Sequence, residues 1–273
     1  MPTLIFDCDG VLADTEQFGH LPAFNSTFEE FSVPVQWSVE DYAEKVKIGG
    51  GKERMRSILT DDVSSQLGLR DDAAKDAAIL AWHKRKTAIY TDLVDGGVMP
   101  ARPGIARLVS EAHDAGWGLA VASTSAEPAV RAVLTHAVGQ DLAAHFAVFA
   151  GDVVPRKKPA PDIYLLALEE LGLSTDDAVV VEDSSNGLRA AVAAGLRTVV
   201  TVSGFTRDED FTGASLVVSS LGDPGDHRDP GDSGEAAEVL ANPLDVEVAS
   251  VVTLATLHQL LNSPSAAPNP EAS

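Results

Sequence analysis

The chain has 273 residues and carries 41 acidic against 20 basic side chains, a formal net charge of −21 at pH 7. Hydrophobic residues make up 45% of it, which is enough for the core of one domain, or of a core domain with a smaller insert. So acidic a chain is not expected to bind nucleic acid or an anionic membrane surface.

Cysteine content and hydropathy narrow the expected location of the protein. Cys8 is the single cysteine, so no internal disulfide can form. The N-terminus lacks a basic-then-apolar signal region, and no apolar stretch reaches the roughly 18 residues that a membrane span needs. We therefore expect a cytoplasmic protein, or one of the plastid stroma if a transit peptide has been removed.

The first expected element is a buried strand, Thr3–Phe6, that ends in acidic residues. From there to residue 95 the pattern is helical and carries no strong strand signal. The expected helices are Glu16–Phe31, Val39–Lys47, Lys52–Leu59 and Asp71–Thr91, punctuated by Pro34 and by Gly49-Gly50-Gly51. Residues 16–95 are thus predicted to form a helical insert after the first strand.

From residue 96 to residue 221 apolar strands alternate with helices. The expected strands are Leu119–Ala122, Phe146–Ala150, Ala178–Val181, Thr198–Val202 and Leu216–Ser219. The expected helices are Ile105–Ala115, Glu127–Val138, Pro161–Leu171 and Gly187–Ala194. This alternation predicts an α/β fold, a Rossmann-like parallel sheet covered on both faces, formed by residues 1–15 and 96–221.

Residues 222–273 form an acidic C-terminal region rich in glycine and proline. Within it, Gly222–Glu235 is predicted to be a flexible loop, because its composition cannot build a packed core. Leu244–Leu261 predicts one more helix, with or without a short strand. Asn262–Ser273 is expected to be a disordered tail.

Asp7 and Asp9 follow the first strand at a spacing of two, which points both side chains to one side. Two carboxylates so close repel each other unless a cation neutralises them, and magnesium prefers oxygen ligands. One carboxylate can also attack phosphorus while the other protonates the leaving oxygen and later deprotonates water. A solvated turn between strand and helix is the competing interpretation.

Three weaker signals follow later strands. Glu182 and Asp183 end an apolar run and can bind metal, although Asp is also a good helix cap. Lys158 precedes a helix start and can neutralise a phosphate and a nucleophilic aspartate, whereas in isolation an exposed basic loop is the simpler interpretation. Ser123-Thr124-Ser125 can hold phosphate oxygens through hydroxyl and backbone N–H groups, or can cap the next helix.

The four signals lie in order at the carboxyl ends of predicted parallel strands, where open α/β sheets place their sites. Over residues 3–220 this ordered set of Asp, Ser, Lys and Glu-Asp resembles the motifs of the haloacid dehalogenase superfamily. The resemblance implies that Asp7 is the nucleophile and Asp9 the general acid and base. It also implies that Ser123 and Lys158 are catalytic residues that contact the phosphate. It implies Mg²⁺ as cofactor, held by Asp7, the Asp9 carbonyl and Asp183, with Glu182 close by. An acid at the position of Asp9 points to phosphoryl transfer rather than dehalogenation.

The helical insert occupies the place of the C1-type cap of that superfamily, which closes over the site and contacts the rest of the substrate. Gly50 and Gly51 permit a close backbone approach, after which Lys52 and Arg54 can grip an anion. A glycine loop before a solvated helix is the alternative. Likewise, His20 is either a cap contact to substrate or an ordinary helix-end residue.

Phe6-Asp7-Cys8-Asp9-Gly10-Val11-Leu12-Ala13-Asp14-Thr15-Glu16 and the stretch from Ile48 to Met55 resemble the CbbY-like group of this superfamily. Its plant and photosynthetic-bacterial members are phosphatases of xylulose-1,5-bisphosphate, a misfire product that inhibits Rubisco. The resemblance implies a monomer that removes the 1-phosphate of this sugar to give xylulose 5-phosphate. The residues assigned to the substrate are Asp14, His20, Tyr42, Gly50, Gly51, Lys52, Arg54, Ser123, Thr124 and Lys158.

Three other functions remain open at this point. One is a phosphatase of another small phosphate ester, such as a hexose or glycolate phosphate. Another is a phosphomutase similar to β-phosphoglucomutase, which must shield its aspartyl-phosphate from water. The third is a non-catalytic binding protein on the same scaffold. Such a protein would usually lose an acid or the lysine, whereas here all of them are present.

Overall fold

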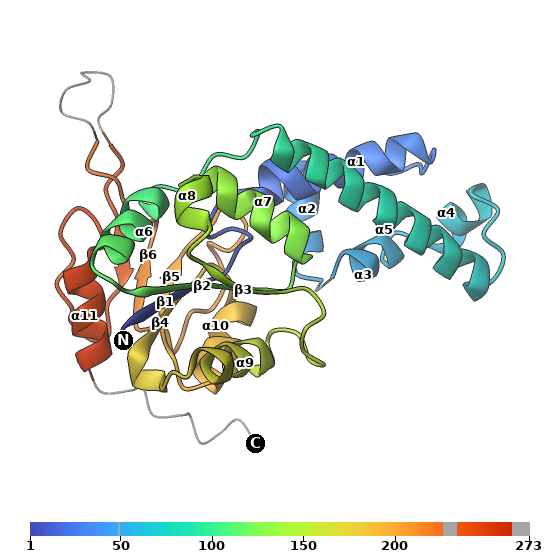
Figure 1. Cartoon of the computed structure of the whole chain (residues 1–273). Helices are drawn as coiled ribbons and strands as arrows, with labels where there is room; N and C mark the ends of the chain where they lie inside the picture. Colours follow the sequence, from blue (N-terminus) through green and yellow to red (C-terminus); the bar gives the residue numbers. More distant parts are fainter. Residues whose placement is uncertain (49, 226–233, 264–273) are drawn as a thin grey trace. The chain divides into compact units, whose positions relative to one another are not determined.

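A computed structural model of the protein describes residues 1–48, 50–225 and 234–263. The chain divides into two compact units. Figure 1 shows the chain coloured by residue number. The core unit consists of Met1–Asp14 and the chain from Pro100 onward, and the insert unit consists of Thr15–Met99. Among the helices within the described ranges, none is long and apolar enough to cross a membrane.

The core unit is built on a seven-stranded sheet with the order β3-β2-β1-β4-β5-β6-β7, which confirms the predicted α/β class. The first six strands are parallel neighbours, and β7 pairs antiparallel with β6. The strands are β1 Thr3–Phe6, β2 Gly118–Ser123, β3 Ala147–Ala150, β4 Ala178–Glu182, β5 Arg197–Thr201, β6 Leu216–Val218 and β7 Val239–Ala241. The last of these was not predicted, because three exposed residues carry too little pattern to mark a strand.

Helices cover both faces of this sheet (Figure 1). They are α6 Ile105–Asp114, α7 Glu127–Val138, α8 Gln140–Ala143, α9 Asp162–Leu171, α10 Ser185–Ala193 and α11 Leu254–Asn262, with a 3₁₀ turn η2 at Thr175–Asp177. On the face of α9 and α10, Ile5, Ala120 and Val180 of the central strands pack against Tyr164 and Ala191. Strands buried on both faces must be apolar throughout, which explains the continuous runs in the sequence.

The insert unit consists of helices joined by turns and loops over its described residues, as the sequence predicts. It contains the π-helical turn η1 Glu16–His20 and the helices α1 Leu21–Glu30, α2 Val39–Val46, α3 Gly51–Arg56, α4 Asp61–Gln66 and α5 Asp72–Asp95. Phe24, Phe28, Trp37 and Tyr42 form its aromatic core, with ring centroids 4.9 to 6.1 Å apart. Helix α4 was missed because it has only six residues, although Thr60 caps it.

The C-terminal helix is shorter than predicted. It begins at Leu254 rather than Leu244, because Thr253 forms a capping box with Thr256 and so sets the helix start. Upstream, Asp245 adopts a positive φ of 50°, which an α-helix cannot contain. The middle of the predicted flexible loop, residues 226–233, and nearly all of the predicted tail, residues 264–273, lie outside the described residues.

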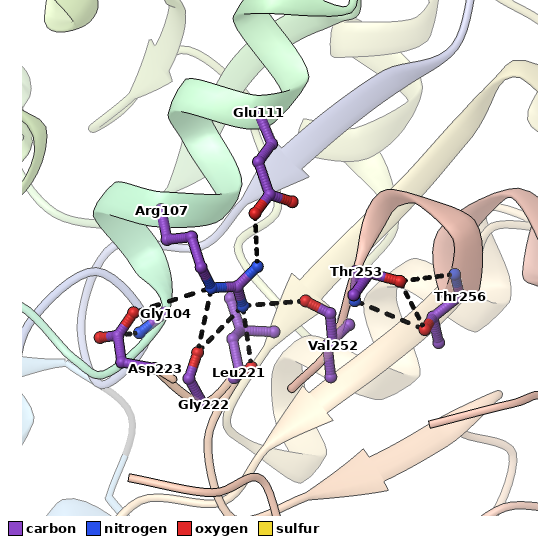
Figure 2. Close-up of polar contacts among 9 residues, drawn as sticks. All are labelled: Gly104, Arg107, Glu111, Leu221, Gly222, Asp223, Val252, Thr253 and Thr256. Carbon is purple, nitrogen blue, oxygen red and sulfur yellow. Dashed lines mark hydrogen bonds and ion pairs between the residues drawn. The ribbon is translucent and has the colours of Figure 1, made fainter. Parts of the chain in front are cut away.

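Arg107 on α6 attaches the C-terminal segment to the rest of the core unit (Figure 2). Its guanidinium donates to the Leu221, Gly222 and Val252 carbonyls at 3.1, 2.9 and 2.9 Å. Asp223 adds a second attachment, since its carboxylate accepts from the backbone N–H of Gly104 at 2.7 Å. One side chain therefore joins α6 to two stretches of chain that lie about a hundred residues or more away.

Replacing Arg107 by alanine should lower the free energy of unfolding by about 2 kcal/mol, because partly buried carbonyls would lose charged donors. Urea denaturation measures this loss. Arg131→Ala is the matched control, since Arg131 makes an exposed ion pair with Glu127 one turn away on α7. It should cost no more than about 0.5 kcal/mol. Equal losses in the two variants would contradict the anchoring role.

Candidate active site

Four of the predicted site residues lie at one edge of the sheet, where β1, β2 and β4 end. Asp7 directly follows β1, and its backbone N–H donates to the Val181 carbonyl of β4 at 2.9 Å. Ser123 is the last residue of β2, Glu182 is the last residue of β4, and Asp183 follows it. Because these three strands are parallel neighbours, their carboxyl ends bring all four side chains together.

Lys158 enters this group from the loop before α9 and bonds three oxygens. Its Nζ donates to Asp7 Oδ1 at 2.6 Å and to Glu182 Oε1 at 2.6 Å. The third acceptor is the Ala122 carbonyl of β2, at 2.8 Å. Tyr164 of α9 also donates its hydroxyl to Glu182 Oε1, and its ring centre lies 4.9 Å from the ammonium. The lysine predicted from its motif is therefore the cation of the acidic cluster, held in place by Glu182 and Tyr164.

The cluster is buried, and burial controls its protonation. Burial raises the pKa of Asp7 to about 7, because the opposing charge of Lys158 only partly offsets desolvation and the Glu182 and Asp9 carboxylates raise it further. Burial also raises the pKa of Asp183 well above its ordinary value, again reinforced by Glu182 and Asp7. A hydrogen bond from Ser203 and the charge of Arg102 act in the opposite direction on Asp183.

Asp9 is held by a residue whose role the sequence did not indicate. The Ser125 hydroxyl donates to its Oδ2 atom, and the Ser125 N–H donates to Ser123 Oγ at 3.2 Å. The sequence also allows Ser125 to cap the next helix, but Ala126 holds that position without a side-chain bond. The position of Ser125 two residues after Ser123 was the available signal. Thr124 lies between them on this loop and is half-buried.

Gly10 and Arg102 complete the strand-end region. Gly10 has a φ of +78°, and a Cβ there would lie 2.1 Å from Asp183 Oδ2, so only glycine fits. Its carbonyl accepts from Arg102 Nη1 at 2.6 Å. Arg102 Nε lies 4.0 Å from Asp14 Oδ1, and the Asp14 side chain is partly exposed. No motif marked Arg102, because its partners are distant in the sequence.

In the insert unit, two of the predicted substrate residues contact each other. The Tyr42 hydroxyl donates to Glu16 Oε2 at 2.5 Å, and Arg54 Nη1 donates to the Tyr42 hydroxyl at 2.6 Å. Arg54 also reaches Glu16 Oε2 at 3.3 Å and the Val46 and Ile48 carbonyls. Arg54, which is predicted to bind an anion of the substrate, is thus already paired with the Glu16 carboxylate. The sequence analysis missed Glu16 as its partner.

The other predicted residues of the insert unit are arranged around α3 and α5. Gly50 has a φ of 97° and precedes α3, whose first residues are Gly51 and the exposed Lys52. His20 is buried, and its Nδ1 lies 2.7 Å from Lys86 Nζ. Its ring stacks on that of Tyr90, with centroids 4.1 Å apart.

Comparison with known proteins identifies the family. A family model of haloacid dehalogenase-like hydrolases matches residues 1–195. The CBBY-like protein of Arabidopsis thaliana is 47% identical over 225 residues, which cover 82% of this chain and 70% of that one. The CbbY protein of Cupriavidus necator is 44% identical over 226 residues, which cover 82% of this chain and 87% of that one.

A solved structure agrees with these relatives. It is a variant of CbbY from Rhodobacter sphaeroides in complex with xylulose-(1,5)bisphosphate, 39% identical, with a TM-score of 0.69. The match covers 81% of this chain and 94% of that one. The resemblance drawn from the motifs is confirmed. The chain therefore belongs to the haloacid dehalogenase-like hydrolases and, within them, to the CbbY-like group, and it is a phosphatase-type enzyme of that family.

Proposed function

We propose that the protein is an Mg²⁺-dependent phosphatase that removes the 1-phosphate of xylulose-1,5-bisphosphate and releases xylulose 5-phosphate. The observation that carries this proposal is the buried contact of Lys158 with Asp7 beside Asp183, together with CbbY relatives of which one binds this sugar bisphosphate. We propose that it acts as a monomer, in the cytoplasm or the plastid stroma.

The acidic cluster fits a divalent cation. One carboxylate oxygen from each of Asp7, Glu182 and Asp183 lies within 4.8 Å of the others. Three buried carboxylates beside one ammonium leave negative charge that a hard cation can neutralise. We assign Asp7, Asp183 and the main-chain carbonyl of Asp9 as ligands. Glu182 lies close to them but bonds Lys158, so we assign it mainly to orient that lysine. When bound, Mg²⁺ offsets charge on the phosphate.

The chemistry that we propose uses two aspartates in turn. Asp7 Oδ2 attacks phosphorus, the bond from phosphorus to the sugar oxygen breaks, and Asp9 donates a proton to the departing oxygen. Water then attacks phosphorus of the aspartyl-phosphate while Asp9 accepts its proton. Inorganic phosphate leaves and the Asp7 carboxylate is regenerated. The Ser125 hydroxyl supports this exchange because it holds the Asp9 carboxylate in one orientation.

The transferred phosphate also needs donors. The Lys158 ammonium already contacts Asp7 Oδ1, so it can neutralise a phosphoryl oxygen that approaches the same carboxylate. We assign the Ser123 hydroxyl and the backbone N–H of Thr124 to the remaining phosphoryl oxygens, since Ser123 ends β2 and Thr124 follows it.

Specificity for a bisphosphate requires a cation for the second phosphate. We assign this role to the exposed Lys52 at the start of α3, with Gly50 and Gly51 giving close access to backbone. Tyr42, Arg54 and His20 are the further sugar contacts that we propose, together with Asp14 of the core unit. Arg54 must share its guanidinium between Glu16 and the substrate.

Asp7→Asn should abolish turnover and should make the free energy of unfolding of the metal-free protein less sensitive to pH. The folded-state pKa of Asp7 is about 7 against an ordinary 3.8, so folding takes up a proton between these values. Metal-free stability therefore falls as pH rises through this window, by about 1.4 kcal/mol per pH unit. The variant lacks this ionisation, so its melting temperature relative to the wild type should rise toward pH 7 and then level off.

Thermal unfolding in a chelator, and again with added Mg²⁺, measures both effects. Mg²⁺ should raise the melting temperature of the wild type more than that of the variant. Asp210→Asn is the control, because that exposed carboxylate is hydrogen-bonded by Thr212, which lowers its pKa. It should gain nothing above pH 7. A wild type whose metal-free stability is flat between about pH 4 and about pH 7 would refute the assigned protonation.

Lys52→Ala should raise KM for xylulose-1,5-bisphosphate about tenfold, the cost of one charged hydrogen bond. It should leave hydrolysis of p-nitrophenyl phosphate unchanged, because that ester has no second phosphate. Lys47→Ala is the matched control, since Lys47 is an exposed neighbour paired with Glu44. Phosphate release is measured on a panel with ribulose-1,5-bisphosphate, fructose-1,6-bisphosphate, glucose 1-phosphate and phosphoglycolate.

Preference for xylulose-1,5-bisphosphate by orders of magnitude in kcat/KM supports the substrate assignment. A preference for a monophosphate, or equal effects of the two lysine variants, overturns it and leaves a general phosphatase. Conversion of glucose 1-phosphate to an isomer, without phosphate release, would instead identify a phosphomutase.

A further inference from the structure

Arg102 is a buried cation that has no place in the chemistry proposed above. Only 8% of its surface is exposed. It stands where the chain returns to the core unit, next to the bridge between Ala13 and Ala101. Its backbone N–H donates to the Leu12 carbonyl at 3.0 Å, which fixes this entry against the loop after β1.

The guanidinium bonds four carbonyls from three segments of the core unit. Nη1 donates to Gly10 at 2.6 Å and to Thr201 at 3.2 Å. Nη2 donates to Val202 and Ser219, both at 2.8 Å. These carbonyls belong to the loop after β1, to the end of β5 and to the segment after β6. A planar fork of donors can join them at once, whereas a single ammonium cannot.

The segments held by Arg102 lie on both sides of Asp183. In the sheet, β4 lies between β1 and β5, so the loop that carries Asp183 runs between the two bonded ends. Gly10 touches the Asp183 carboxylate, since a Cβ at Gly10 would meet it at 2.1 Å. Ser203, which follows the bonded Val202, also acts on this carboxylate, because its side chain lowers the pKa of Asp183. Arg102 thus holds both neighbours of Asp183 without bonding it.

We propose that Arg102 is a positioning residue for the reaction. It fixes the Gly10 peptide and the end of β5 so that the carboxylates of Asp7 and Asp183 converge on one cation. The charge of Arg102 adds to this, because it opposes the build-up of negative charge around Asp183. This inference rests on the proposed function, because it takes Asp7 and Asp183 to be acids that hold Mg²⁺.

The test compares Arg102→Lys and Arg102→Gln with Arg107→Lys. Arg107 is the control because it also bonds backbone carbonyls, but those of Leu221, Gly222 and Val252 rather than the ones that flank Asp183. Calorimetric titration with Mg²⁺ gives the dissociation constant in each protein. Melting temperature, and kcat and KM on p-nitrophenyl phosphate, are measured in parallel. Arg102→Lys should weaken Mg²⁺ binding at least tenfold and lower kcat at least tenfold, with KM changed less than twofold. Arg102→Gln should do at least as much.

Arg107→Lys should lower the melting temperature and leave Mg²⁺ affinity and kcat unchanged. If both Arg102 variants keep Mg²⁺ affinity and kcat within twofold of the wild type, Arg102 serves stability alone and the proposal is overturned. If the wild type hydrolyses no phosphate ester but Arg102→Lys still weakens Mg²⁺ binding tenfold, the proposed function fails and the positioning role stands. If the wild type binds no Mg²⁺, both fail.

Discussion

The contact between the Lys158 ammonium and the Asp7 carboxylate is the interaction on which the site depends. Neither group is stable alone in so buried a place, because an isolated charge loses its hydration there. Their pairing partly offsets the burial that raises the pKa of Asp7, and the bonds from Lys158 and Tyr164 to Glu182 hold the ammonium in place. Everything else at the strand ends is arranged around this pair.

The pair also explains why the site tolerates so many acids. The Asp7 and Glu182 carboxylates raise the pKa of Lys158 well above its ordinary value, against the lowering effect of burial. The lysine is therefore charged at any physiological pH. The Lys158 ammonium alone does not balance three carboxylates, and this excess charge is a general reason for a strand-end cluster of this kind to recruit a divalent ion.

The sequence was sufficient to predict the placement of residues that depends on local chain position. Asp7, Ser123, Lys158 and Asp183 each sit at a strand end or in a loop that the apolar pattern located. Arg102, Ser125 and Glu16 were missed because their partners are 92, 116 and at least 26 residues away. Such contacts arise only when the topology brings distant segments together. The strand β7 and the helix α4 were not predicted for a different reason, because each has too few residues to show a periodic pattern.

The antiparallel strand β7 has a consequence for the behaviour of the protein at high concentration. Without it, the buried strand β6 would end the sheet with a row of unpaired backbone groups, a template on which another molecule can add a strand. The strand that covers it is only three residues long and exposed, so it offers little length for such pairing. The net charge of −21 also makes copies of the protein repel each other. Together, this charge and the short edge strand should discourage edge-to-edge aggregation at that end of the sheet.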